Sequence, residues 1–303
     1  MRSSLDCIPC FMRQALEAGR QISNDEQLIG QALKRIAGSL ADFNLDLSPP
    51  EMGQHIHRIL RQEVGSDDPY LQIKKNSTRV ALTLVPDVLK HLEQSDNPFE
   101  VAVRFAIAGN ILDFALMSVW DDHKINASFD KALSHPIDSN TVEQLRLELH
   151  KAKRVLILAD NVGETVFDRF LIEQLPPHLD VTYAVKASPV INDAIAVDAV
   201  DAGIDKLADV IDNGTDAPGT LLHQCSPSFL AHFNAADIVI AKGQANFESL
   251  NTTDRQVYFL TQIKCIVIAE AYGYNVGDWI VTTTSKLRDK AGQKLNSMVE
   301  GVS

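Results

Sequence analysis

The chain has 303 residues, enough for one large domain or two domains of ordinary size. Its 28 Lys and Arg residues against 40 Asp and Glu residues give a net charge of −12, which argues against the clustered positive surface of a nucleic-acid binder. Four cysteines are too few for a disulfide scaffold and indicate reduced thiols, so we expect a cytoplasmic protein.

The N-terminus shows no targeting segment, because Asp6 comes before any apolar run could form. The most apolar stretch, residues 101–120, carries Arg104, Asn110 and Asp113, more polar residues than a membrane span tolerates. We therefore expect a buried helix there and no membrane partner.

The first half of the chain is predicted to be helical. Apolar residues recur at spacings of three and four, and prolines separate the segments. The expected helices span residues 7–20, 25–43, 50–63, 69–94 and 99–121. No strand pattern precedes residue 150. These features predict a mainly helical N-terminal domain over residues 1–148.

The pattern changes near residue 149, where short β-branched runs alternate with helical stretches. The expected strands span residues 154–159, 180–185, 208–211, 238–241 and 265–269. Such alternation predicts a mostly parallel sheet covered by helices on both faces. The fold class is therefore α/β, with a Rossmann-like αβα domain over residues 149–303. Neither a Gly-x-Gly-x-x-Gly fingerprint nor a P-loop is present.

Polar residues of one chemical kind follow the predicted strands. They are Asp160, Asn161 and Glu164 after the first strand, Asn192 and Asp193 after the second, Asp212 to Thr215 at the end of the third, and Lys242, Gly243 and Asn246 after the fourth. Carboxylate and amide oxygens suit a hard divalent ion, and a lysine beside a glycine can contact phosphate. Each motif alone is more often a turn, but four at successive strand ends favour a ligand site.

The longer motifs resemble a known family. DNVGE, KASPVINDA, IDNGTDAPGT and AKGQANFESL, in this order, are similar to motifs of the metal-dependent damage-control phosphatases, formerly a domain of unknown function numbered 89. CIPCFMRQAL, DPYLQIKKNS and AGNILDF resemble the stand-alone microbial branch with an N-terminal Cys-x-x-Cys. The resemblance covers nearly the whole chain.

The resemblance implies roles for individual residues. It places a divalent metal (Mg, Mn, Co or Ni) on Asp160, Asn161 and Asp193. It also implies that Lys242 contacts phosphate. The substrate-binding residues expected around the site are Asn110, Asp113, Glu164, Lys242 and Asn246.

Some of these residues also have a simpler interpretation. Asn110 and Asp113 are three residues apart and so share a helix face, where a buried hydrogen bond between helices is an equal alternative. Cys7 and Cys10 supply only two soft ligands and open a helix, so a packing or labile-thiol role is the default.

The leading hypothesis is a metal-dependent phosphatase acting on a small phosphorylated metabolite, for which we expect a sugar phosphate. Asp160 could attack phosphorus, or a water activated by the metal could do so, and the sequence does not choose between them. One rival is a carboxyl methyltransferase that uses S-adenosylmethionine, although the turn at Asp160 to Gly163 is poor in glycine. Another is a non-catalytic metal- or nucleotide-binding module.

Overall fold

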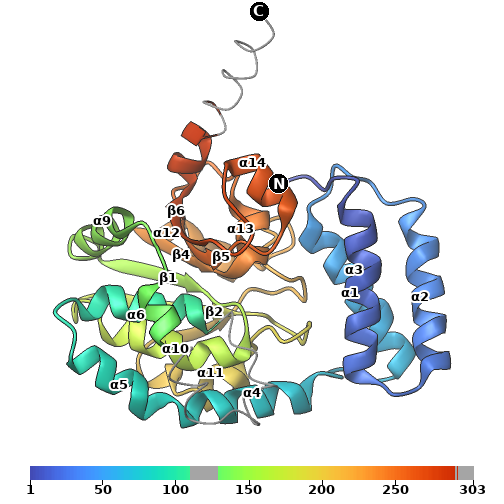
Figure 1. The fold of residues 1–303 in the computed structure, drawn as a ribbon, viewed down its shortest axis with the longest axis horizontal. Coiled ribbons are helices and arrows are strands. Elements are labelled where there is room, and N and C mark those ends of the chain that lie inside the picture. Colours follow the sequence, from blue (N-terminus) through green and yellow to red (C-terminus); the bar gives the residue numbers. More distant parts are fainter. Residues whose placement is uncertain (110–128, 291, 293–303) are drawn as a thin grey trace, which may run out of the picture.

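A computed structural model describes residues 1–109, 129–290 and 292 of the chain (Figure 1). The N-terminal helices α1 (Cys7–Ile22), α2 (Glu26–Leu40) and α3 (Pro49–Val64) form a bundle at one side of the molecule. Apolar residues at helical spacing, among them Phe11, Ala15 and Ile56, give this bundle a core of its own.

Helices α4 (Leu71–Thr83), α5 (Val85–Glu93), α6 (Pro98–Ala108) and α9 (Ser139–Leu149) follow. The single helix expected over residues 69–94 is thus two, because Pro86 lacks an amide proton and starts a new helix. The second half of the helix expected over residues 99–121, with Asn110 and Asp113, lies outside the described residues.

The sheet has six strands in the order β3-β2-β1-β4-β5-β6. Their bounds are β1 (Arg154–Leu158), β2 (Asp180–Val185), β3 (Asp209–Asp212), β4 (Ile238–Lys242), β5 (Tyr258–Gln262) and β6 (Trp279–Thr283). All neighbouring strands are parallel except β5 and β6, which are antiparallel. The α/β class with a mostly parallel sheet is confirmed.

Helices cover both faces of this sheet, so alternate residues of each strand enter different cores. In β1, Val155 and Ile157 contact the core shared with α4–α6, α9, α10 (Val162–Glu173) and α11 (Ala196–Asp201). Leu156 and Leu158 contact the other core, made with α12 (Pro227–Ala235), α13 (Gly243–Leu250) and α14 (Ile266–Tyr272). Helices α4–α6 and α9 thus share a core with the sheet, whereas α1–α3 do not; a domain boundary at residue 148 stays a prediction.

The prediction of a strand over residues 265–269 is wrong, because this run lies in α14. A short apolar run has no periodicity that separates a strand from a buried helix. Burial shows the difference: Ile266 is 54% exposed and Ile268 fully buried, although both would face the same side of a strand. The strands in this part of the chain are β5 and β6, neither of which was predicted from the sequence.

A single 3₁₀ turn, η1 (Ile204–Lys206), joins α11 to β3. In the part of the chain that the structure describes, no helix combines the length and the apolarity needed to cross a bilayer.

Candidate functional site

The carboxyl ends of β1 and β4 form the switch point of the sheet. The two strands are neighbours, but the chain continues from β1 into α10 on one face and from β4 into α13 on the other. In open α/β sheets, ligands bind in the crevice that this divergence leaves above the strand ends. We therefore expect the predicted site residues to lie around this point.

The turns after β1 and β2 are held together by their backbones. Asn161 and Asp193 form an isolated antiparallel bridge, and the Ala194 amide donates to the Asp160 carbonyl at 2.8 Å. The Asn161 side-chain amide donates to Asp160 Oδ2 at 3.0 Å. Asp160, Asn161 and Asp193 line the same cavity of about 580 Å³, so the fold brings the three predicted metal ligands together.

The side chain of Asp193 has a buried oxygen at the cavity. Its side chain is buried, and Oδ2 has no hydrogen-bond partner among the described residues, although the Lys186 ammonium lies 3.6 Å away. Burial raises the pKa of Asp193, against the opposing charge of Lys186. A buried carboxylate oxygen without a hydrogen bond is costly, and a cation in the cavity would remove that cost.

The donor set fits a small hard cation. Magnesium-like ions are held by one or two protein carboxylates, and water and substrate phosphate oxygens complete the shell. Two carboxylates and one amide meet that need. Over residues 1–109 and 129–290, no group of three or more His, Cys, Asp or Glu side chains forms a metal-binding cluster, so these residues do not offer the closed ligand shell of a structural zinc site.

Gly243 allows the chain after β4 to approach Asp160 closely. Its φ is +77°, and a Cβ atom at this position would lie 1.9 Å from Asp160 Oδ2. Only glycine fits both the conformation and the space. The glycine that follows Lys242 in the sequence therefore makes room for the carboxylate of the neighbouring turn.

Lys242 itself does not line the cavity. Its side chain is fully buried, and the ammonium donates to the Ala106 carbonyl at 2.9 Å, to Asp168 Oδ1 at 2.5 Å and to Glu164. Asp168 also accepts a hydrogen bond from the Tyr183 hydroxyl at 2.7 Å. We call Glu164, Asp168, Tyr183 and Lys242 the buried ion cluster.

The charges of the buried ion cluster hold Lys242 in place. Burial alone would lower the pKa of Lys242, but Asp168 and Glu164 outweigh it and raise this pKa to about 12. Burial raises the pKa of Glu164, which Lys242 opposes. A lysine has three N–H donors, and protein oxygens accept all three here. Direct contact of Lys242 with phosphate would require one of these bonds to break, and it stays a prediction.

Two predicted substrate-binding residues also lie beneath the turn and outside the cavity lining. Glu164 is fully buried, and its Oε2 accepts a hydrogen bond from the backbone amide of Asn161 at 3.5 Å. Asn246 is fully buried and donates to the carbonyls of Ala159 at 3.0 Å and Lys242 at 2.7 Å. In this structure both residues position the turns that carry the cavity-lining side chains.

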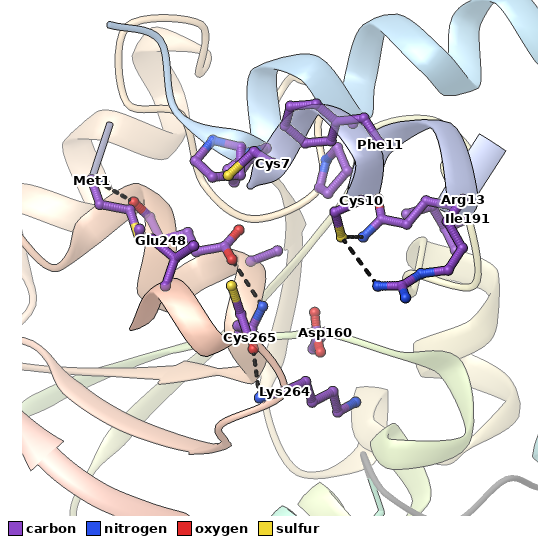
Figure 2. Close-up of a pocket in the computed structure, with 18 of the residues that line it drawn as sticks. Met1, Cys7, Cys10, Phe11, Arg13, Asp160, Ile191, Glu248, Lys264 and Cys265 are labelled. Atoms are coloured by element: carbon purple, nitrogen blue, oxygen red, sulfur yellow. Dashed lines mark hydrogen bonds between the residues drawn. The ribbon is translucent and has the colours of Figure 1, made fainter. Parts of the chain in front are cut away.

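Lys264, for which no role was predicted from the sequence, lines the cavity together with Glu248, a carboxylate that follows the fourth predicted strand (Figure 2). Gln244 links them: its side-chain oxygen accepts the Lys264 amide and its nitrogen donates to Glu248 Oε1, both at 2.8 Å. Burial raises the pKa of Glu248 to about 7. Lys264 was missed because β5, which ends at Gln262, was not recognised as a strand; otherwise its position would have matched that of Lys242.

The cysteines Cys7 and Cys10 of α1 also line the cavity, as does Cys265 (Figure 2). Cys7 is buried in the core of the N-terminal bundle, which agrees with a packing role. Burial raises the pKa of Cys265.

Comparisons with known proteins agree with this architecture. The family model of the damage-control phosphatase ARMT1-like domain matches residues 3–280. A damage-control phosphatase of Pyrococcus horikoshii is 34% identical over 273 residues, which cover 89% of this chain and 93% of that protein. A damage-control phosphatase of Archaeoglobus fulgidus is 31% identical over 290 residues, covering 92% of this chain and 98% of that protein.

A solved structure shares the fold. The crystal structure of a DUF89 family protein from Pyrococcus horikoshii matches with a TM-score of 0.85 at 32% identity, covering 94% of this chain and 99% of that chain. The assignment to the stand-alone branch with an N-terminal Cys-x-x-Cys stays a prediction. Because the family model spans most of the sequence and the relatives match over nearly their full lengths, this chain belongs to the damage-control phosphatase ARMT1-like (DUF89) family.

Proposed function

We propose that this protein is a metal-dependent phosphatase that hydrolyses the phosphomonoester of a small phosphorylated metabolite of the sugar-phosphate kind. The observation that carries the proposal is the meeting of Asp160, Asn161 and Asp193 at one cavity, where Asp193 Oδ2 accepts no hydrogen bond from the residues that the structure describes. The names of the relatives from Pyrococcus and Archaeoglobus support the activity.

Asp160, Asn161 and Asp193 would hold a divalent ion such as Mg²⁺, Mn²⁺, Co²⁺ or Ni²⁺. When bound, the ion neutralises charge that develops on the phosphoryl oxygens. Lys264 lines the same cavity and supplies a second positive charge to the phosphoryl group. Lys242 acts as a positioning residue, because its partner Glu164 accepts the Asn161 amide and so fixes the turn.

Two routes are open for the attacking group. Asp160 can form a covalent aspartyl-phosphate that water then hydrolyses, or Asp160 can orient a water molecule that attacks phosphorus directly. An acid-quenched single turnover separates the routes. Phosphate covalently attached to the protein supports the first, and free phosphate alone supports the second.

The function is tested by phosphate release from a panel of sugar phosphates, before and after EDTA treatment and with added Mn²⁺ or Mg²⁺. We expect EDTA to abolish release and the ions to restore it. Asp193→Asn is expected to weaken Mn²⁺ binding, measured by calorimetry, and turnover together. Asp212→Asn is the matched control, because this exposed aspartate ends β3 at the same edge but does not line the cavity. Full activity of a metal-free preparation would overturn the proposal.

A further inference from the structure

One face of α1 forms a long wall of the cavity. Cys10, Arg13 and Glu17 of α1 and Asp6, the residue that precedes the helix, line the cavity at helical spacing, so they lie along one stripe. At 1.5 Å per residue, this stripe extends about 16 Å, far more than a phosphoryl group occupies. Figure 2 shows Cys10 and Arg13 on one side of the cavity, with Asp160 and Lys264 on the other. The cavity therefore has room for a substrate with a second end.

Arg13 carries a positive charge on this wall. Its Nη2 lies 4.0 Å from Cys10 Sγ, and the side-chain nitrogen of Gln14 lies 3.9 Å from the same sulfur. The two side chains are thus directed to one point at the cavity. Arg20 on the same helix is ion-paired with Glu26 at 3.4 Å, whereas Arg13 has no ion pair within the described residues.

The phosphoryl end of the substrate is already provided for by the metal ligands and Lys264. Among the described residues that line the cavity, Arg13 and Lys264 are the basic side chains. A guanidinium offers a planar pair of donors that matches a carboxylate or a phosphate, while a neutral hydroxyl end needs no charge. A second positive charge on the far wall therefore fits a second negative charge on the substrate.

We propose that Arg13 recognises a second anionic group of the substrate, a carboxylate or a second phosphate, and so determines specificity. The inference rests on the proposed phosphatase function and narrows its substrate class. The substrate is a phosphorylated sugar acid or a sugar bisphosphate, and a neutral sugar monophosphate is the poorer substrate. The Cys-x-x-Cys-x-x-Arg-Gln segment of α1 thereby acts as the recognition wall of the site.

The experiment compares kcat/KM for matched compounds in the metal-loaded, full-length protein. Glucose 6-phosphate is paired with 6-phosphogluconate, and fructose 6-phosphate with fructose 1,6-bisphosphate, which separates a carboxylate from a second phosphate. We expect the wild type to prefer at least one anionic member. Loss of a charged hydrogen bond predicts that Arg13→Gln lowers kcat/KM for that member by about 10- to 100-fold. Its effect on the neutral partner is expected to stay within about twofold.

Arg20→Gln is the control, because Arg20 lies on the same helix but does not line the cavity. It is expected to leave all four values unchanged. An equal loss for neutral and anionic compounds in Arg13→Gln would show that Arg13 binds the transferred phosphoryl group and would overturn the inference alone. A wild-type preference for the neutral members would do the same. If none of the compounds releases phosphate, the proposed function is overturned together with the inference.

Discussion

Two lysines at the carboxyl ends of the neighbouring strands β4 and β5 have opposite surroundings. Lys242 ends β4 and is fully buried, with its ammonium bound by Glu164, Asp168 and a backbone carbonyl. Lys264 follows β5, has an exposed side chain and lines the cavity beside Asp160 (Figure 2). The same residue type is thus part of the buried ion cluster at one strand end and part of the cavity lining at the next.

A lysine at the carboxyl end of a strand is therefore not by itself a phosphate ligand. Its role depends on whether the protein encloses the side chain or leaves it at a cavity. Helices α6 and α10 cover the end of β4, and their oxygens satisfy Lys242. The Lys264 side chain, by contrast, is exposed and lines the cavity. We therefore expect substitutions in the buried ion cluster to lower the free energy of unfolding. Substitution of the cavity-lining Lys264 is expected to lower turnover.

The largest effect is expected for Lys242→Ala. Removal of the ammonium leaves two buried carboxylates, Glu164 and Asp168, without their cation, which typically costs about 3–5 kcal/mol of unfolding free energy. Denaturant unfolding measures this loss, and Lys264→Ala is the control with little expected change. A Lys242→Ala protein of normal stability with lost activity would instead support the direct phosphate contact predicted from the motif.

For Lys264→Ala we expect the reverse result, a loss of turnover in a protein of normal stability. One preorganised charge at the transition state is worth about 3 kcal/mol, so kcat/KM should fall about 100-fold. The assay is phosphate release with saturating divalent ion. Lys151→Ala, an exposed lysine remote from the cavity, is the matched control. Normal kinetics of Lys264→Ala would remove Lys264 from the proposed mechanism.

Asp216, in the segment after β3, binds α3 of the N-terminal bundle. Its carboxylate accepts hydrogen bonds from Gln54 at 2.8 Å, from Arg58 at 2.6 Å and from Arg61, all on α3. Asp216→Asn should lower the unfolding free energy at pH 7 by about 2 kcal/mol, because hydrogen bonds to a charged group are lost. Asp209→Asn, at the exposed start of β3, is expected to change it little.

The same contacts predict a pH dependence. Burial alone would raise the pKa of Asp216, but the bonds from Arg58, Arg61 and Gln54 outweigh it and hold this pKa well below the ordinary value of 3.8. Because the folded state has the lower pKa, the stabilisation is complete above pH 3.8 and is lost as the pH falls below it. Urea unfolding from pH 7 to pH 3 should show the wild type and Asp216→Asn converging only at the acidic end. A constant difference would contradict this assignment.

The smallest effect concerns Ile191, which lines the cavity next to the Asn192–Asp193 pair. Its φ of +46° is in the left-handed region, which costs a β-branched residue about 1–2 kcal/mol. Ile191→Gly and Ile191→Ala both remove the side chain, but only glycine relieves the strain. We expect the glycine variant to be the more stable by about 1 kcal/mol in denaturant unfolding. Equal stability would mean that the backbone relaxes at this position without cost.

Several features could be predicted from the sequence because they depend on local patterns. Short β-branched runs separated by helical stretches predicted β1 to β4 and the α/β class. Parallel strands end at one edge of the sheet, so polar residues after several strands were expected around one site; Asp160, Asn161 and Asp193 line one cavity, whereas Lys242 does not. Their role as metal ligands stays a prediction.

Other features were decided by tertiary structure. The run at residues 265–269 becomes helix α14 because one side of it is buried against the sheet while the other faces outward, which a five-residue pattern does not encode. With that strand misplaced, Lys264 was not recognised. Likewise, no local pattern places the stripe of α1 with Arg13 beside a turn almost 150 residues away.

The two lysines show the physical reason for this division. Residue type and the strand that carries it are local features, so the position of Lys242 at the carboxyl edge of the sheet, beside a glycine, could be predicted from the sequence. How deeply a side chain is buried, and whether its donors find acceptors, depends on neighbours from distant segments of the chain. The packing of α6 and α10 over β4 pairs the ammonium of Lys242 with protein oxygens, whereas Lys264, after the neighbouring strand β5, lines the cavity.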